Sequence, residues 1–419
     1  MNPKSVFETF GGLGIAPALL DIIARYKFQE PTPIQRQAIP IAIEGKDVVG
    51  IAQTGTGKTL AFGIPMIQIL ARSKGQGLVL LPTRELALQV DVELNKIGRS
   101  FGLKTAVLIG GLSLKPQIAM LARNPHIIIA TPGRLLDHLE HRTAKLDKIN
   151  ILVLDEADRM LDMGFEPQIR RILHSLPKNR QTMLFSATLP QEIMKIASSY
   201  MRLPIRIEVA PPGTTVQSVA QEIFVVKKED KLWLLEKILN EYKGSALVFT
   251  RTKYGAKKVA YRVKIMGHRV AEIHGNRSLG QRRDALEGFK SGKYRVLVAT
   301  DIASRGIDVQ GIELVLNFDL PEQAEDYVHR IGRTARAGRE GHAISFAMPD
   351  QRKEVGAIEF LIKKNLPISK LPGTPPERRQ QITLPSGGQP QFGGNRPPQK
   401  KFPPRFNRRG SSRNFKPRR

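Results

Sequence analysis

The chain has 419 residues, of which 41% are hydrophobic, and it carries a formal net charge of +28. This length leaves room for two or three domains with buried cores. The absence of cysteine excludes disulfides and thiolate-bound zinc or iron–sulfur centres, and it suits a reducing cytoplasm. Because no apolar run could span a bilayer and MNPKSVFETF lacks a signal-peptide pattern, we expect no membrane partner.

The positive charge suggests a polyanionic partner and is unevenly distributed. From Leu371 onward, twelve Lys or Arg stand against one acidic residue, Glu377, a net charge of +11 in 49 residues that leaves +17 for the rest. This segment has no apolar periodicity and cannot bury enough surface to offset its ordering entropy. We therefore expect residues 369–419 to form a disordered basic tail.

Short apolar runs recur along the chain, and most precede a stretch with helical spacing. Near-continuous apolar strands that alternate with helices are typical of buried parallel sheets. The segment APPGTTVQS (210–218) interrupts the pattern and is the expected linker. We predict two α/β domains, residues 1–210 and 217–368. The predicted strands are GLVLL (77–81), TAVLI (105–109), HIIIA (126–130), ILVLD (151–155), TMLFS (182–186), ALVFT (246–250), YRVLVAT (294–300), LVLNFD (314–319) and HAISFA (342–347).

Ligands of open parallel sheets bind beyond the carboxyl ends of the strands. AQTGTGKT (52–59) follows the short run DVVGI and fits the phosphate-loop pattern, with Ala52 at the usual first glycine. Its backbone N–H groups would surround phosphate oxygens, while Lys58 adds charge and the Thr59 hydroxyl ligates Mg²⁺. A glycine-rich turn with an incidental lysine is the alternative. The candidate nucleotide-binding residues of this loop are Thr54, Gly55, Thr56, Gly57, Lys58 and Thr59.

Two adjacent carboxylates follow the apolar run in ILVLDEAD (151–158). Asp155 is expected to hold Mg²⁺ through water, and Glu156 to orient or deprotonate an attacking water. Acidic residues also begin many helices, because the helix dipole favours them there. With a phosphate loop about 100 residues upstream, however, the pair indicates a nucleoside triphosphatase.

Together these motifs resemble those of the DEAD-box RNA helicases, most closely the RhlE-type bacterial branch, over about residues 5–368. The resemblance implies two tandem RecA-like parallel-sheet domains and an RNA helicase that hydrolyses ATP with Mg²⁺. KFQEPTPIQ (27–35) resembles the Q motif of the family. There Phe28 would stack on adenine, Gln35 would hydrogen-bond its edge and Phe10 would support both, although a turn before a helix start is the alternative.

Further motifs resemble the RNA-contacting segments of the family: PTRELA (82–87), GG (110–111) and TPGR (131–134), then LVFTRT (247–252), HGNRSLGQRR (274–283) and ATDIASRGID (299–308). TPGR should begin a helix with a threonine cap and a proline in the first turn. Leu279 stands where the family commonly has glutamine, so that contact is missing or Gln281 replaces it. Backbone contacts would not specify base sequence. The candidates for RNA contact are Pro82, Arg84, Gly111, Thr131, Gly133, Arg134, Arg251, Gly275, Arg282 and Thr300.

The remaining motifs imply a site shared by both domains. By resemblance, Ser186 and Thr188 of SAT would bond near Asp158 and couple ATP to RNA. The first half has a phosphate loop and carboxylates but no evident cation for the transition state, whereas HRIGRTARAG (329–338) has arginines without a phosphate loop. We therefore expect a composite site with arginine fingers, which contribute about 10³–10⁵ in rate. The residues expected from the second half are Arg333 and Arg336 at the γ-phosphate, Gly306 and Asp308 at the ribose and phosphates, and His329 in the Asp158 network.

The expected function is RNA-stimulated ATP hydrolysis coupled to local, sequence-tolerant unwinding of short RNA duplexes. ATP and single-stranded RNA would each bind both domains, so each should raise the affinity for the other. A DNA helicase and an ATP-gated RNA clamp or annealing chaperone are the alternatives. The tail, with phenylalanines among arginines and lysines, would add RNA binding or would merely be solvated. Ribosome-assembly and RNA-decay proteins are the partners that the branch suggests, and cold adaptation is a further role.

Overall fold

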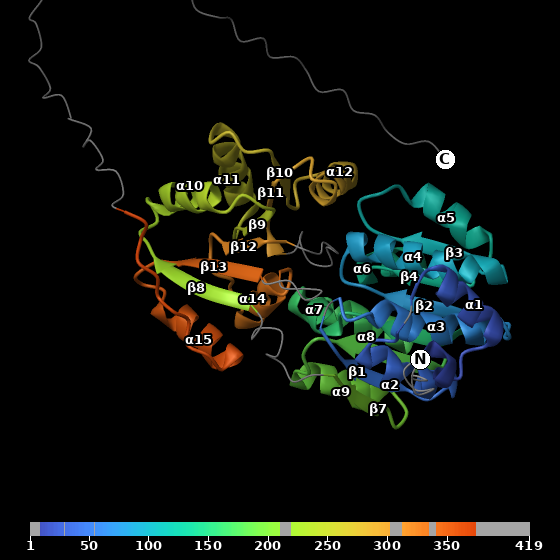
Figure 1. The fold of residues 1–419 in the computed structure, drawn as a ribbon. Coiled ribbons are helices and arrows are strands. Elements are labelled where there is room, and N and C mark those ends of the chain that lie inside the picture. The colour runs from blue at the N-terminus through green and yellow to red at the C-terminus, as the bar shows by residue number, and fades with distance from the viewer. Residues whose placement is uncertain are drawn as a thin grey trace, which may run out of the picture. The chain divides into compact units, whose positions relative to one another are not determined.

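The computed structural model describes residues 9–28, 30–53, 55–209, 219–301, 312–334 and 341–373. Within these ranges the chain builds two sheets whose paired strands all run parallel, with helices packed on their faces (Figure 1). The predicted fold class, tandem parallel-sheet α/β domains, is thereby confirmed. The predicted linker at 210–218 and the tail beyond residue 373 lie outside the described residues. No described helix is both long and apolar enough to cross a membrane.

The first sheet has seven strands in the order β3-β4-β2-β5-β6-β1-β7. Its elements are η2 (Phe10–Leu13), α1 (Pro17–Arg25), α2 (Pro33–Ile43), β1 (Val48–Ile51), α3 (Lys58–Leu70), β2 (Gln76–Leu80), α4 (Arg84–Gly98), η3 (Arg99–Phe101), β3 (Thr105–Leu108), α5 (Leu114–Ala122), β4 (Ile127–Ala130), α6 (Pro132–Glu140), β5 (Ile149–Leu154), α7 (Ala157–Asp162), α8 (Glu166–His174), β6 (Gln181–Ser186), α9 (Gln191–Tyr200) and β7 (Ile205–Glu208).

The apolar strands of this sheet are buried on both faces. In β5, Ile151 and Val153 join the core on one face, whereas Leu152 and Leu154 join the core on the other. Successive side chains of a strand point to opposite faces, so a continuous apolar run is required when helices cover both. This double burial explains why the central strands were readable from the sequence.

The second sheet has six strands in the order β10-β11-β9-β12-β13-β8. In β9, Val248 packs on one face and Leu247 and Phe249 on the other, so this sheet is covered on both sides as well. Its elements are β8 (Val219–Val225), α10 (Lys231–Glu241), β9 (Ala246–Phe249), α11 (Lys253–Ile265), β10 (Val270–Ile273), α12 (Leu279–Lys290), β11 (Val296–Ala299), β12 (Leu314–Asn317), α14 (Ala324–Ile331), β13 (Gly341–Ala347) and α15 (Arg352–Ile362).

Candidate functional site

The phosphate-loop segment lies between β1 and α3. Gly55 and Gly57 have φ angles of 84° and 89°, which are in the left-handed region that glycine tolerates best. Lys58 begins α3, is buried, and donates from Nζ to the carbonyl oxygen of Ala52 at 3.0 Å. Thr59 is the second residue of the helix. The first-turn N–H groups of α3 have no partners within the helix, so this terminus suits an anion.

Gln35 connects the Q-motif segment to this loop. Its Oε1 accepts a hydrogen bond from the Thr32 N–H at 3.0 Å, and its Nε2 donates to the Gly57 carbonyl at 2.9 Å. A Cβ at Gly57 would collide with the Gln35 amide, so this position requires glycine. Phe10 is buried in the adjoining core, and the partly buried Phe28 packs against the same core. Gln35 therefore holds both the start of α2 and the loop.

Asp155 follows β5 directly and is buried beside the loop. Burial raises the pKa of its carboxyl to about 6; the Lys58 cation acts against this rise and the Glu156 anion adds to it. Asp155 Oδ1 accepts a hydrogen bond from the Glu156 N–H at 2.9 Å. The Asp155 carboxylate and the hydroxyl of Thr59, which follows Lys58 in α3, are oxygen ligands of the kind that Mg²⁺ prefers.

Glu156 is held by Arg159, a residue that the sequence analysis did not single out. Glu156 takes a left-handed conformation (φ 52°) at the N-cap of α7, and Arg159 Nη1 donates to its Oε2 at 2.7 Å. The two side chains are 3% and 1% exposed. Burial alone would raise the pKa of Glu156, but the cations of Arg159, Lys58 and Arg333 outweigh it and lower the pKa. The first half therefore contains a buried arginine, Arg159, whose guanidinium is paired with Glu156.

Asp158 is the centre of a compact hydrogen-bond network at the ends of β5 and β6. Its Oδ2 accepts bonds from the Ala187 N–H at 3.0 Å, the Thr188 N–H at 2.9 Å and the Thr188 hydroxyl at 3.0 Å. Its own N–H donates to Ser186 Oγ at 3.3 Å. The structure thus brings the predicted coupling residues of the first half into direct contact.

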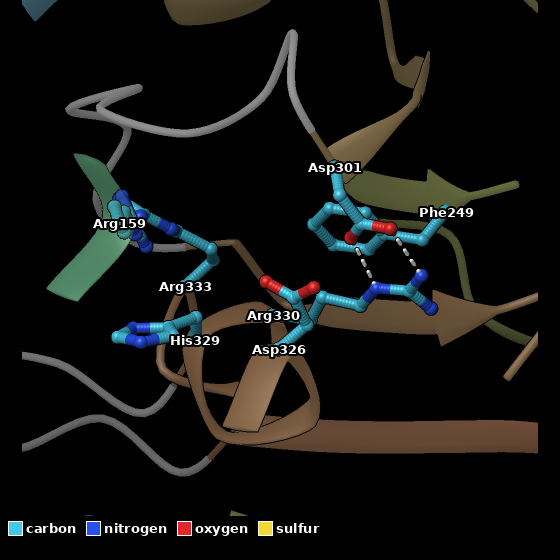
Figure 2. Close-up of a pocket in the computed structure, with 7 residues that line it drawn as sticks. All are labelled: Arg159, Phe249, Asp301, Asp326, His329, Arg330 and Arg333. Atoms are coloured by element: carbon cyan, nitrogen blue, oxygen red, sulfur yellow. Dashed lines mark hydrogen bonds and ion pairs between the residues drawn. The ribbon is translucent and has the colours of Figure 1, made fainter. Parts of the chain in front are cut away.

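Residues from both halves of the chain line one pocket, shown in Figure 2: Arg159 from α7, and Phe249, Asp301, Asp326, His329, Arg330 and Arg333 from the second half. Arg333 follows α14, is buried, and lies close enough to Glu156 for its cation to lower that pKa. Burial, and next the Arg159 cation, lower the pKa of His329 well below its ordinary value. Among the described side chains, His329 makes no hydrogen bond to Asp158. It lines the pocket together with Arg159 (Figure 2).

The RNA-contact candidates of the first half lie where β2, β3 and β4 end. Pro82 precedes Thr83, whose hydroxyl caps α4 by accepting a bond from the Leu86 N–H at 3.3 Å. Gly111 has a φ angle of 74°, and a Cβ there would collide with the Arg84 guanidinium. The Gly110–Gly111 turn therefore provides the space that Arg84 occupies.

TPGR begins helix α6, as expected. Thr131 holds the N-cap position and Pro132 the first turn, but the Thr131 hydroxyl makes no capping hydrogen bond. Arg134 Nη1 donates to the Leu112 carbonyl at 2.9 Å, which ties α6 to the segment after β3. No described atom lies within 4 Å of where a Cβ of Gly133 would stand, so a ligand backbone has room to approach.

The candidates of the second half follow β9, β10 and β11. Arg251 is anchored by its N–H to Asp319 Oδ2 at 3.2 Å and by Nη2 to the Leu320 carbonyl at 3.4 Å. Gly275, like Gly133, has open space at its Cβ position, and Thr300 directly follows β11. Arg282 is largely buried and pairs with Glu85 of the first half at 2.9 Å.

Leu279 and Gln281 both lie in the first turn of α12. Gln281 is engaged in capping α12: its Oε1 accepts from the Ser278 N–H at 3.1 Å, and its own N–H donates to Ser278 Oγ at 3.3 Å. Its side-chain oxygen is therefore already engaged within α12. Leu279 packs against the core of the first sheet, so an apolar contact takes the place of a polar one. Four further candidates, Thr54, Gly306, Asp308 and Arg336, lie outside the described residues.

Comparison with known proteins gives matches over both halves. A model of the DEAD/DEAH box helicase family matches residues 32–196, and one of the helicase conserved C-terminal domain matches residues 230–338. The chain is similar to the ATP-dependent rRNA helicase RRP3 of Debaryomyces hansenii, with 42% identity over 370 residues, 87% of this chain and 78% of the relative. It is also similar to the DEAD-box ATP-dependent RNA helicase CshA of Bacillus subtilis, with 42% identity over 381 residues, 90% of this chain and 77% of that one. Among solved structures it resembles S. cerevisiae Dbp5 bound to RNA and ADP BeF3, with a TM-score of 0.77, 32% identity, and coverage of 86% of this chain and 96% of Dbp5.

Proposed function

The chain belongs to the DEAD-box family of ATP-dependent RNA helicases, and from that premise we propose how its residues divide the reaction. The phosphate loop and the N-terminus of α3 bind the phosphates of ATP, with Lys58 as the neighbouring cation. Gln35, Phe28 and Phe10 recognise adenine. Asp155 and Thr59 would hold Mg²⁺, which would supply positive charge near the transferred phosphoryl group. The buried Asp155 carboxyl, whose pKa the neighbouring Lys58 cation acts to lower, supports this assignment.

Glu156 orients the attacking water and accepts its proton, and Arg159 is a positioning residue for that carboxylate. An ion pair of 2.7 Å between two buried side chains supports this role, because it restricts where the carboxylate lies. Arg333 and Arg336 belong to the second half of the chain. They stabilise the charge that develops in the transition state. The single observation that carries the composite site is the shared pocket, which Arg159 and Arg333 both line (Figure 2).

RNA binds along the carboxyl ends of both sheets through backbone contacts, at the candidate residues of the six motifs. The hydrogen-bond network of Asp158, Ser186 and Thr188 couples RNA binding to the ATP site. His329 takes part in this coupling from the second half of the chain. Because ATP and RNA each use both halves, each raises the affinity for the other. One strand held in this way cannot keep its duplex partner, so unwinding is local and tolerant of sequence.

We further propose that the chain belongs to the RhlE-type branch and that its basic tail is an auxiliary RNA-binding segment. Its expected protein partners are those of ribosome assembly or RNA decay. The similarity to a helicase named for rRNA supports a ribosomal role. An ATP-gated clamp or annealing chaperone is the second candidate, because the basic tail binds RNA without needing hydrolysis.

The deciding experiment measures ATP hydrolysis by the full chain without nucleic acid, with RNA and with DNA, alongside unwinding of a short RNA duplex. We expect RNA alone to stimulate hydrolysis strongly and the duplex to separate only with ATP. Equal hydrolysis in all three conditions would contradict RNA gating. Stimulation by RNA without strand separation would favour the clamp.

A further inference from the structure

Helix α11 (Lys253–Ile265) presents an aromatic and apolar stripe to solvent. Tyr254, Tyr261 and Ile265 are 70%, 64% and 60% exposed. Their spacing of seven and four residues places them in one line along the helix. The opposite face packs on the second sheet through Ala256, Val259, Ala260 and Val263.

All the charged residues of α11 are basic. Lys258 falls on the stripe between the two tyrosines, and Lys257 and Lys264 flank it. The 13 residues of the helix contain five Lys or Arg and no acidic residue. A partner that matches this face has regularly spaced negative charges and flat apolar groups. Single-stranded RNA has both, in its phosphates and its bases.

The stripe begins directly at a segment to which we have assigned an RNA contact. The Thr252 hydroxyl caps α11 by accepting a bond from the Gly255 N–H at 3.0 Å, and Arg251 precedes it. A helix of this length extends about 20 Å from that point. An RNA strand that leaves Arg251 therefore meets the basic and aromatic face without an intervening segment.

We propose that the outer face of α11 is an auxiliary platform for single-stranded RNA that extends beyond the site shared by the two halves. Tyr254 and Tyr261 stack on bases, and Lys257 and Lys258 contact phosphates. Lys253 Nζ lies over the Tyr254 ring, 5.4 Å from its centre, so base stacking uses the other ring face. This inference rests on the proposed function, because RNA must already occupy the shared site.

Fluorescence anisotropy with labelled RNA tests the platform. The full chain and its Tyr254→Ala/Tyr261→Ala variant are each titrated with a short single strand of about 6 nucleotides and a long one of about 25. We expect the affinity of the variant for the long strand to fall about tenfold or more, because each lost base stack weakens binding severalfold. Its affinity for the short strand, and its ATP hydrolysis at saturating short RNA, should stay at the level of the unmodified chain.

A second variant, Lys257→Gln/Lys258→Gln, addresses the charges. It should reduce the slope of log affinity against log salt by about 0.7 for each lost phosphate contact, again only for the long strand. Helix α15 supplies the matched control, since Phe360 is 87% exposed and Lys353 is exposed beside acidic neighbours. The Phe360→Ala/Lys353→Gln variant should bind both strands like the unmodified chain.

Two results would overturn the platform. Unchanged binding of the long strand by the tyrosine variant would show that RNA does not use this face. Equal weakening for both strands would show that the substitutions damage the shared site. Failure of the proposed function looks different, because the unmodified chain would then show no RNA-stimulated hydrolysis with the short strand.

Discussion

Two buried arginines line the same pocket from opposite halves of the chain, and they are held very differently (Figure 2). Arg330 donates to Asp301 through Nε at 2.6 Å and Nη2 at 2.7 Å, and through Nη1 to Asn317 at 2.9 Å and to the Asp319 carbonyl at 2.7 Å. It also lies over the Phe249 ring, 5.0 Å from its centre. Arg330 therefore connects β9, β12 and α14 as a fixed structural element.

Arg159, by contrast, has one strong bond, to Glu156, and its buried Nε has no hydrogen-bond partner. A buried arginine with unused donors is not optimised for stability, because the desolvation of each unpaired polar atom is left uncompensated. Its position is explained better by what it does to Glu156. The comparison teaches that Arg330 supports the fold of the pocket, whereas Arg159 fixes the carboxylate of Glu156, to which we assign the attacking water.

Arg330→Ala should cause the largest loss of stability, because Arg330 is the arginine that supports the fold of the pocket. The substitution removes four hydrogen bonds at once and leaves the charge of Asp301 without its bidentate donor. We expect a loss of about 3–5 kcal/mol in the free energy of unfolding, measured by urea denaturation. The exposed pair of Arg170 with Glu166 gives the control, and Arg170→Ala should cause no measurable change. A stability of Arg330→Ala equal to that of the unmodified chain would break the comparison.

Arg159→Lys should give a smaller effect of a different kind. It keeps a cation near Glu156 but loses the planar guanidinium that fixes the carboxylate. We expect kcat for ATP hydrolysis to fall about tenfold, because misplaced groups lose effective concentration, with little change in KM for ATP or in RNA affinity. In the Glu156→Gln background the same substitution should cause no further loss. A loss of equal size in both backgrounds would show that Arg159 acts elsewhere.

The central strands and motif positions could be predicted because their physical requirements are local. Strands buried on both faces must be apolar throughout, and a phosphate loop needs glycines at positive φ followed by a helix. Strands β7, β8 and β10 were missed because they lie at sheet edges, where polar residues such as Glu208, Glu222 and Glu272 interrupt the apolar run.

The composition of the pocket was beyond the reach of the sequence for a different reason. Arg159 lies three residues after Glu156 on a helix, a spacing that permits an ion pair and could have marked it. Whether such a pair is solvated or buried depends on tertiary packing. Likewise, the bidentate contact of Arg330 with Asp301 and that of Arg282 with Glu85 join segments far apart in the chain. Those contacts follow from the topology and not from any local pattern.

The most direct test of the composite site is a double-mutant cycle in single-turnover ATP hydrolysis at saturating ATP and RNA. Arg333→Ala alone should lower the rate by about 10³-fold or more and Glu156→Gln alone by about 10²–10⁴-fold, with ATP binding retained. Because both side chains serve one transition state, the double variant should be scarcely slower than the worse single variant. Rate losses that multiply, or normal turnover by Arg333→Ala, would contradict a catalytic site shared by the two halves.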